Sequence, residues 1–199
     1  AFLILMALGL LNAIGGLWSA DRIYDVEVLP VTRRMIDVLE GSFTLFPVII
    51  AIFYAGDLVW RERDRRTHDI VGATPLPDWA FVLPKTLAIS LVLISTLLVS
   101  VLAAILVQAL KGYADFQFDK YLLWYVLPQG IEWIQSAVPA VFLQAISPHK
   151  FVGWGLMVLF IVVVLFTFPE VGLDHSLYRY GQTPSVPLSD MNGWGRFWI

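Results

Sequence analysis

Long apolar stretches alternate with short polar stretches along this chain, and the pattern predicts membrane-spanning helices. No charged residue occurs in 1–20, 86–110 or 151–169. About 20 apolar residues in a helix are enough to cross a hydrocarbon core of about 30 Å. A helix also pairs its own backbone N–H and C=O groups, which find no water in lipid. We therefore expect an all-α fold, a polytopic transmembrane helix bundle.

The polar stretches divide a single transmembrane domain, residues 1–199, into five predicted spans. These spans are 1–18, 41–59, 84–110, 121–146 and 151–168. We expect a polar loop over 19–40 and an extracytoplasmic tail over 169–199, which is polar and rich in glycine and proline. The chain opens on Ala1 inside an apolar run and ends where another apolar run begins. We interpret it as a fragment of a longer protein, with a sixth span just after Ile199.

The alternative for residues 1–20 is a signal peptide, which we disfavour because no basic segment precedes the apolar run. The fourth predicted span is irregular. Pro128, Gly130 and Pro139 interrupt it, so we expect a broken or kinked helix there.

Glu132 is the ionisable residue deep inside the fourth predicted span. A charge at the membrane centre costs about 2.5–3.5 kcal/mol, so such residues usually face protein or a watery cavity. Two interpretations stay open for this position. Glu132 is either a translocation or proton-coupling residue, or a structural carboxyl that is protonated or hydrogen-bonded to Gln135 or to backbone groups freed by Pro128.

The densest charge cluster lies between the second and third predicted spans. Its acidic and basic residues recur four positions apart, a spacing that supports a helix by about 0.2–0.5 kcal/mol per pair. These pairs are Glu62 with Arg66 and Arg65 with Asp69. The prolines of 74–77 should end that helix. We expect a charged helix over 60–73 that is either a solvated boundary helix or a docking helix.

Basic residues in short loops set the orientation of a membrane protein, because they stay on the cytoplasmic side. The loop 60–79 holds a dense group of arginines, and the turn 147–150 adds Lys150. We therefore place both segments in the cytoplasm. The protein is expected to be a multi-pass component of the plasma membrane, in bacteria the inner membrane, in contact with membrane lipid.

Motifs for chemistry are missing from the sequence. There is no cysteine, no G-x-x-x-x-G-K-[ST] phosphate loop and no H-E-x-x-H zinc motif. The histidines His68, His149 and His175 lie in separate loops, without the spacing of metal ligands. Asp174-His175-Ser176 has the residue types of a hydrolase triad, but neighbours in sequence seldom reach that geometry. We expect no enzyme activity, no metal, no cofactor held by this chain and no nucleic-acid partner.

The order of these parts resembles the permease subunit of an ATP-binding-cassette (ABC) exporter of the type-2 class. The residues that carry the resemblance are Gly56-Asp57-Leu58-Val59-Trp60-Arg61-Glu62-Arg63, Arg65-Arg66-Thr67, Ala73-Thr74-Pro75-Leu76-Pro77 and Lys85. In that family a span, a charged coupling helix, a proline-marked turn, a lysine and a long span follow one another.

The resemblance implies that the coupling helix sits in a groove of a cytoplasmic ATP-binding subunit, which holds ATP and Mg²⁺. ATP-driven closure of two such subunits would then tilt the permease halves. A second permease half or a homodimer mate is expected as well. The implied partner-binding residues are Arg61, Glu62, Arg63, Arg65, Arg66 and Asp69.

A second resemblance covers the tail. Leu177-Tyr178-Arg179-Tyr180-Gly181 and Ser189-Asp190-Met191-Asn192-Gly193 resemble a subgroup whose permease is fused to an aminopeptidase-N-like zinc peptidase domain. Leu188 stands where that subgroup has an aromatic residue. The resemblance implies a peptidase domain in the parent protein, outside this fragment.

Two other functions remain as alternatives to an ATP-driven permease. One is a non-transporting scaffold or anchor, for a larger complex or an attached peptidase, which would tolerate neutralised arginines in the charged helix. The other is a secondary transporter that uses Glu132 as a proton site and needs no ATP. Neither the substrate nor the direction of transport follows from the residues themselves.

Overall fold

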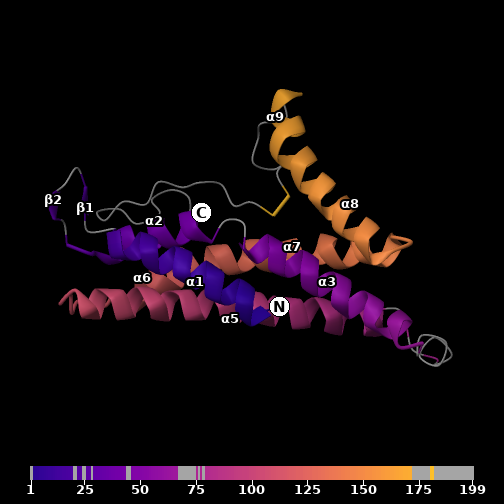
Figure 1. The fold of residues 1–199 in the computed structure, drawn as a ribbon, viewed down its shortest axis with the longest axis horizontal. Helices are drawn as coiled ribbons and strands as arrows, with labels where there is room; N and C mark the ends of the chain where they lie inside the picture. The colour runs from indigo at the N-terminus through magenta and orange to yellow at the C-terminus, as the bar shows by residue number, and fades with distance from the viewer. Residues whose placement is uncertain are drawn as a thin grey trace.

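The structure is a computed structural model that describes residues 2–19, 22–23, 26–27, 29–43, 46–66, 75, 77, 79–171, 180 and 181. Within these residues the fold is all-α, as predicted, apart from a two-residue antiparallel ladder between β1 (Arg22–Ile23) and β2 (Val26–Glu27). Most helices lie side by side along one direction, and one long helix near the C-terminus rises away from them (Figure 1).

The described helices follow the apolar stretches of the sequence. They are α1 (Phe2–Ser19), α2 (Thr32–Ser42), α3 (Phe46–Asp64), α5 (Trp79–Leu110), α6 (Phe118–Lys120), η1 (Tyr121–Val126), α7 (Leu127–Ile146), α8 (Lys150–Val162), η2 (Val163–Thr167) and α9 (Phe168–Glu170). The two η segments are π-helical, so η1 continues directly into α7, and α8 continues through η2 into α9. The fourth predicted span is thus η1 followed directly by α7, with a π-helical segment that ends at Val126, shortly before Pro128.

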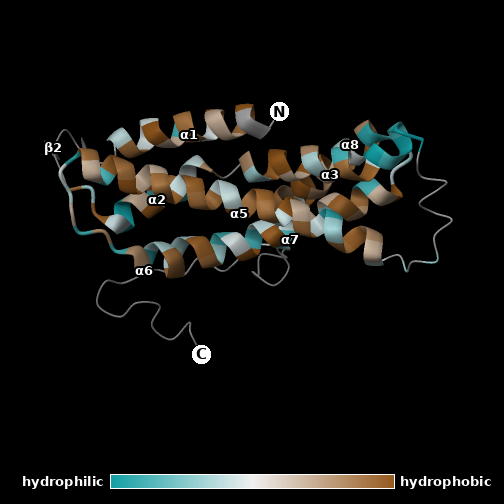
Figure 2. Ribbon diagram, turned by 90° about the horizontal axis from the view of Figure 1, so that it is seen from below, coloured by the Kyte–Doolittle hydropathy of each residue, from teal (hydrophilic) through white to brown (hydrophobic). Residues whose placement is uncertain are grey.

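Two described helices are long and apolar enough to cross a membrane: Trp79–Leu110 and Lys150–Thr167. A third span results if α2 and α3, which are bent by 47° relative to each other, act as one broken span, and Ile4–Ser19 is a shorter apolar helix. Hydrophobic residues line the long sides of the helices, and hydrophilic residues gather at the ends of the bundle (Figure 2). Five complete crossings remain a prediction.

The core lies where α7 packs between α3 and α5. Small and aliphatic side chains fill this contact, and small residues allow helix axes to come close together. The residues with no exposed surface here include Ile50, Ala51 and Ala55 of α3, Leu93 and Leu97 of α5, and Ala137 of α7. Close packing of these three helices fixes the relative positions of their ends.

The prediction of a polar loop over 19–40 was wrong in its second half, because α2 begins at Thr32. This helix buries Thr32, Met35, Ile36 and Leu39. Their spacing is that of one helical face, with polar residues on the other side. The second predicted span accordingly starts later than expected, at Phe46, with Pro47 in its first turn, where the missing N–H of proline costs little.

The prediction of a separate charged helix over 60–73 also needs correction. Helix α3 runs without a break through Trp60 and ends at Asp64. Arg66 has a φ of 56°, which is left-handed backbone that a helix cannot contain. Arg61, Glu62 and Arg63 therefore form the last turn of α3 itself. Residues 67–74, with Asp69, lie outside the described part of the chain.

Candidate functional site

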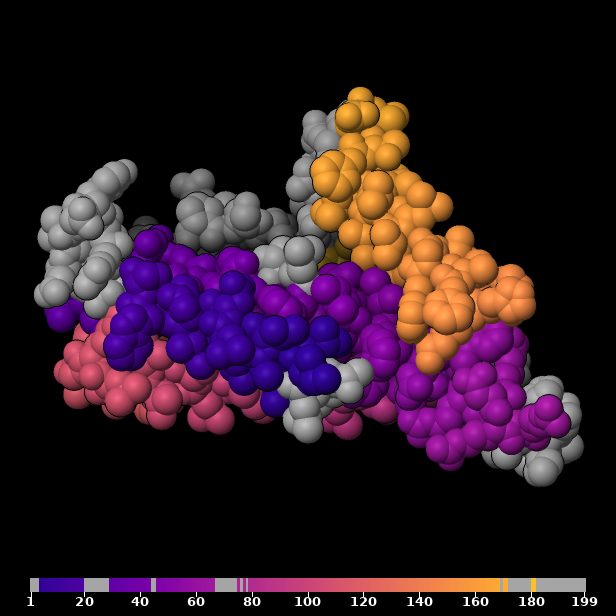
Figure 3. Space-filling model, in the orientation of Figure 1, coloured from indigo at the N-terminus to yellow at the C-terminus, as the bar shows by residue number. Residues whose placement is uncertain are grey.

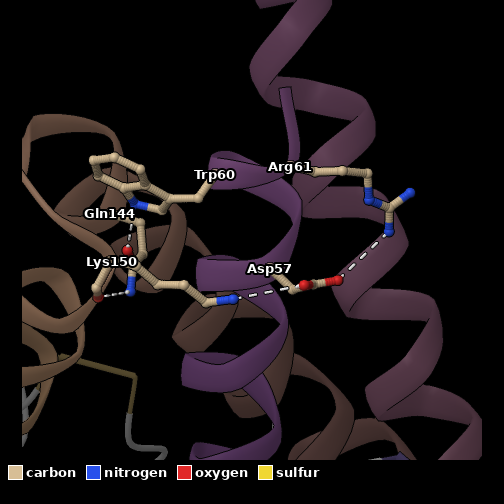
Figure 4. Close-up of polar contacts among 5 residues, drawn as sticks. All are labelled: Asp57, Trp60, Arg61, Gln144 and Lys150. Atoms are coloured by element: carbon tan, nitrogen blue, oxygen red, sulfur yellow. Dashed lines mark hydrogen bonds and ion pairs between the residues drawn. The ribbon is translucent and has the colours of Figure 1, made fainter. Parts of the chain in front are cut away.

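Three segments that are far apart in the sequence meet at one end of the bundle. They are the last turns of α3, the first turns of α5 and the turn between α7 and α8, and we call their meeting point the charged end. Glu62 Oε1 of α3 lies 3.0 Å from Lys85 Nζ of α5. Asp57 Oδ1 of α3 lies 3.6 Å from Lys150 Nζ at the start of α8. Figure 4 shows the second of these contacts.

Gln144 is the buried polar centre of the charged end. Its side chain is 1% exposed and uses both amide atoms. Trp60 Nε1 donates a hydrogen bond to Gln144 Oε1 over 3.0 Å, and Gln144 Nε2 donates to the backbone oxygen of Lys150 over 3.4 Å (Figure 4). One side chain of α7 thus links the end of α3 to the start of α8.

Two glycines make room for this arrangement. A Cβ atom on Gly153 would overlap the side-chain amide of Gln144, and one on Gly56 would overlap the indole nitrogen of Trp154. Trp154 Nε1 is buried and has no hydrogen-bond acceptor among the described residues. Its indole edge lies against the backbone of α3 at Gly56. A larger residue at either glycine would force Gln144 or Trp154 to shift, or the helices to move.

Four arginines lie in the last turn of α3 and in the turn that follows it. Arg61 Nη2 lies 3.6 Å from Asp57 Oδ2, and the Arg63 guanidinium lies 4.6 Å from the centre of the Trp60 ring. Arg65 and Arg66 are exposed in the turn that follows α3. The Arg61 and Arg63 guanidinium groups are thus held by contacts within α3, at exposed positions.

The structure separates the residues that we predicted as partner-binding. Arg61, Arg63, Arg65 and Arg66 are exposed, whereas Glu62 is half-buried and faces Lys85. The expected pairing of Glu62 with Arg66 does not fit a helix that ends at Asp64. Glu62 therefore stabilises the contact between α3 and α5. The pair of Arg65 with Asp69 includes a residue outside the described ranges.

Glu132 and Gln135 lie away from the charged end, further along α7. Glu132 is half-buried and accepts a hydrogen bond from Gln129 Nε2 over 3.4 Å. It also lies within electrostatic range of Glu40 on α2. Gln135 is exposed, and its backbone oxygen accepts a hydrogen bond from Tyr180 over 3.2 Å. The structure thus gives Glu132 a different amide partner from the Gln135 of our structural interpretation.

Sequence reasoning missed Gln144, Lys150 and Asp57 as members of one site. A signal for Gln144 was present, because a polar residue in an apolar helix needs a partner. That partner, Trp60, stands 84 positions away. Two predicted cytoplasmic segments, 60–79 and 147–150, were nevertheless assigned to the same side, and Lys150 of the second contacts Asp57, which lies just before the first.

The comparison with protein families found a match that covers the charged end. Residues 1–168 match the family described as ABC-2 family transporter protein, a range that includes every segment of the charged end. Neither a curated protein nor a solved structure matches this chain. The peptidase resemblance rests on 177–193, of which only Tyr180 and Gly181 are described, and no comparison shows that fusion.

Members of this family are helical membrane proteins that normally work with a cytoplasmic ATP-binding subunit. The matched range covers most of the chain, from its first residue to the end of the long helix that starts at Lys150. The chain therefore belongs to the ABC-2 transporter family, and it is a membrane permease component of an ABC transporter.

Proposed function

We propose that this chain is the permease of an ATP-driven exporter and that its charged end binds the cytoplasmic ATP-binding subunit. The observation that carries the proposal is the exposed arginine group on a helix end that is tied to three other helices, α5, α7 and α8. ATP and Mg²⁺ would be held by the partner subunit. A second permease half, or a second copy of this chain, would complete the path through the plasma membrane.

Arginine suits such a contact for chemical reasons. Its planar guanidinium group donates parallel hydrogen bonds to a carboxylate, and it is less strongly hydrated than the ammonium group of lysine. Arg61 and Arg63 are ordered by Asp57 and Trp60, so less side-chain entropy is lost on binding. The partner surface expected opposite them is acidic.

The contacts of the charged end provide a path for movement. A displacement of the α3 end by the partner would act on α5 through Glu62 and Lys85, and on α8 through Asp57 and Lys150. The buried hydrogen bond from Trp60 to Gln144 adds α7 to the same unit. Packed interfaces of this kind move as rigid bodies more readily than they deform.

The test is co-purification of an ATP-hydrolysing subunit with the full-length parent protein from its native host. We expect the wild type to retain that subunit. Reversal of all four charges, Arg61→Glu, Arg63→Glu, Arg65→Glu and Arg66→Glu, should reduce the recovered ATPase activity about tenfold or more, because like charges then face each other.

Two controls separate docking from folding. Lys120→Glu reverses a charge in α6, at the other end of the bundle, and should leave the recovered ATPase unchanged. The four-fold reversed protein must still insert into the membrane and elute as the wild type does in size-exclusion chromatography. An ATPase that stays bound after reversal, or an absent ATPase in the wild type, would contradict the proposal and favour a scaffold.

A further inference from the structure

An open apolar groove runs along the junction of α3 and α8. Ile49, Ile52 and Phe53 of α3 form one wall, and Trp154 and Val158 of α8 form the other. Its volume is about 310 Å³, at the lower end of the range of about 300–1,000 Å³ for ligand sites. Figure 3 shows α8 projecting from the body of the molecule.

A cation lies at the aromatic end of this groove. Lys150 Nζ is 5.9 Å from the centre of the Phe53 ring and 5.6 Å from that of Trp154, and both rings line the groove. The two rings stack on each other at 6.0 Å. The Lys150 side chain is 25% exposed, so its ammonium group remains accessible from the water boundary.

The local charge balance favours an anion. Asp57 is shared between Lys150 and Arg61, at 3.6 Å in each case. One carboxylate therefore faces two cations, and both contacts are longer than a close ion pair. An apolar slot with an excess of positive charge at one end matches an amphiphile with an apolar chain and an anionic head.

We propose that the groove between α3 and α8 binds one acyl chain of an anionic membrane phospholipid, whose phosphate lies against Lys150. Basic pockets between helices on the cytoplasmic side are typical binding places for anionic headgroups. The ammonium group of Lys150 would keep its cation–π contacts while it contacts the phosphate. The bound phospholipid is a resident ligand of the permease, and its binding does not depend on the docking of an ATPase.

Photo-crosslinking in vesicles tests this site. The full-length protein is reconstituted in equal parts of phosphatidylglycerol and phosphatidylcholine, with a diazirine on the acyl chain of one lipid at a time. Mass spectrometry then locates the adducts. We expect adducts on Ile52, Trp154 and Val158, with phosphatidylglycerol about fivefold ahead of phosphatidylcholine. Lys150→Gln should remove that preference, and Lys150→Arg should keep it.

Matched variants define the result further. Lys120→Gln removes a cation elsewhere and should leave the preference unchanged, whereas Val158→Trp fills the groove and should lower the groove adducts of both lipids. Equal labelling by the two lipids, or loss of the preference in both Lys150 variants, would overturn the proposal. So would an absence of groove adducts while the exposed Leu165 is labelled, because a protein surface would then cover the groove.

Discussion

Replacing Gly153 with alanine is expected to destabilise the protein by about 1–3 kcal/mol, the usual cost of an overpacked contact. The new Cβ would meet the side-chain amide of Gln144, which is fixed on both sides by hydrogen bonds. The amide therefore has to give up a partner or α8 has to move. Thermal unfolding of the purified protein, followed by the fluorescence of its tryptophans, measures the loss.

Gly155 offers a matched control on the same helix, because nothing lies within 4 Å of a Cβ placed there. In a helix, alanine is favoured over glycine by about 0.5–1 kcal/mol. Gly155→Ala should therefore leave stability unchanged or raise it, so the two substitutions differ in sign. Gly153→Ala should also cost less in a protein that already carries Gln144→Ala. If Gly153→Ala and Gly155→Ala changed the stability equally, Gln144 would not be held as described.

Replacing Gln144 with leucine should cost about 1–2 kcal/mol of stability. Leucine keeps the volume of the side chain but leaves the indole N–H of Trp60 without an acceptor. An unsatisfied buried donor costs about 1–3 kcal/mol in proteins generally, and hydrogen bonds between membrane helices fall at the lower end of that scale. The same unfolding measurement applies, and the variant should also loosen the end of α3.

The control is Gln135→Leu, on the same helix but at an exposed position. It should shift the unfolding midpoint only slightly. Loosening of α3 is read from proteolysis near Arg65 and Arg66, which should be faster in Gln144→Leu and unchanged in Gln135→Leu. Equal stability of the two variants would mean that the Trp60–Gln144 hydrogen bond contributes little to the charged end.

The predicted spans and the described helices agree best where local composition decides the structure. The uncharged run of 86–110 lies within Trp79–Leu110, and most of the run of 151–169 lies within Lys150–Thr167, the two helices that are long and apolar enough to cross a membrane. Apolar length alone selects a helix there, because lipid leaves no partner for an open backbone. Pro128, which lacks an N–H group, predicted an irregular helix, and the structure has a π-helical segment just before it.

Disagreement arises where tertiary contacts decide. Helix α2 carries charges on its outer face, so its composition resembles a loop, and only the periodicity of its buried residues marks it as a helix. At Trp60 the composition of α3 changes but its backbone does not. The change from apolar to charged residues indicates where the chain is expected to pass from lipid to water. The helix itself continues, because α3 packs against α5 and α7.

The charged residues of the candidate site could be predicted from the sequence, but the contacts between its helices could not. The arginine group was visible in the sequence, since charge density needs no knowledge of packing. Partner binding by Glu62 stays a prediction, and the structure adds its contact with Lys85 within the chain. Gln144 reaches Trp60 only because α3 and α7 lie side by side, and a contact across 84 positions follows from the fold alone.

Site-specific crosslinking from the turn after α3 tests the central claim most directly. The chain has no cysteine, so Arg65→Cys carries a photoreactive label at one defined position. In native-host membranes we expect a covalent adduct with an ATP-binding protein, and none from Asp115→Cys, which is exposed in the segment between α5 and α6. An adduct with that protein from Asp115→Cys, or none from Arg65→Cys, would contradict the account.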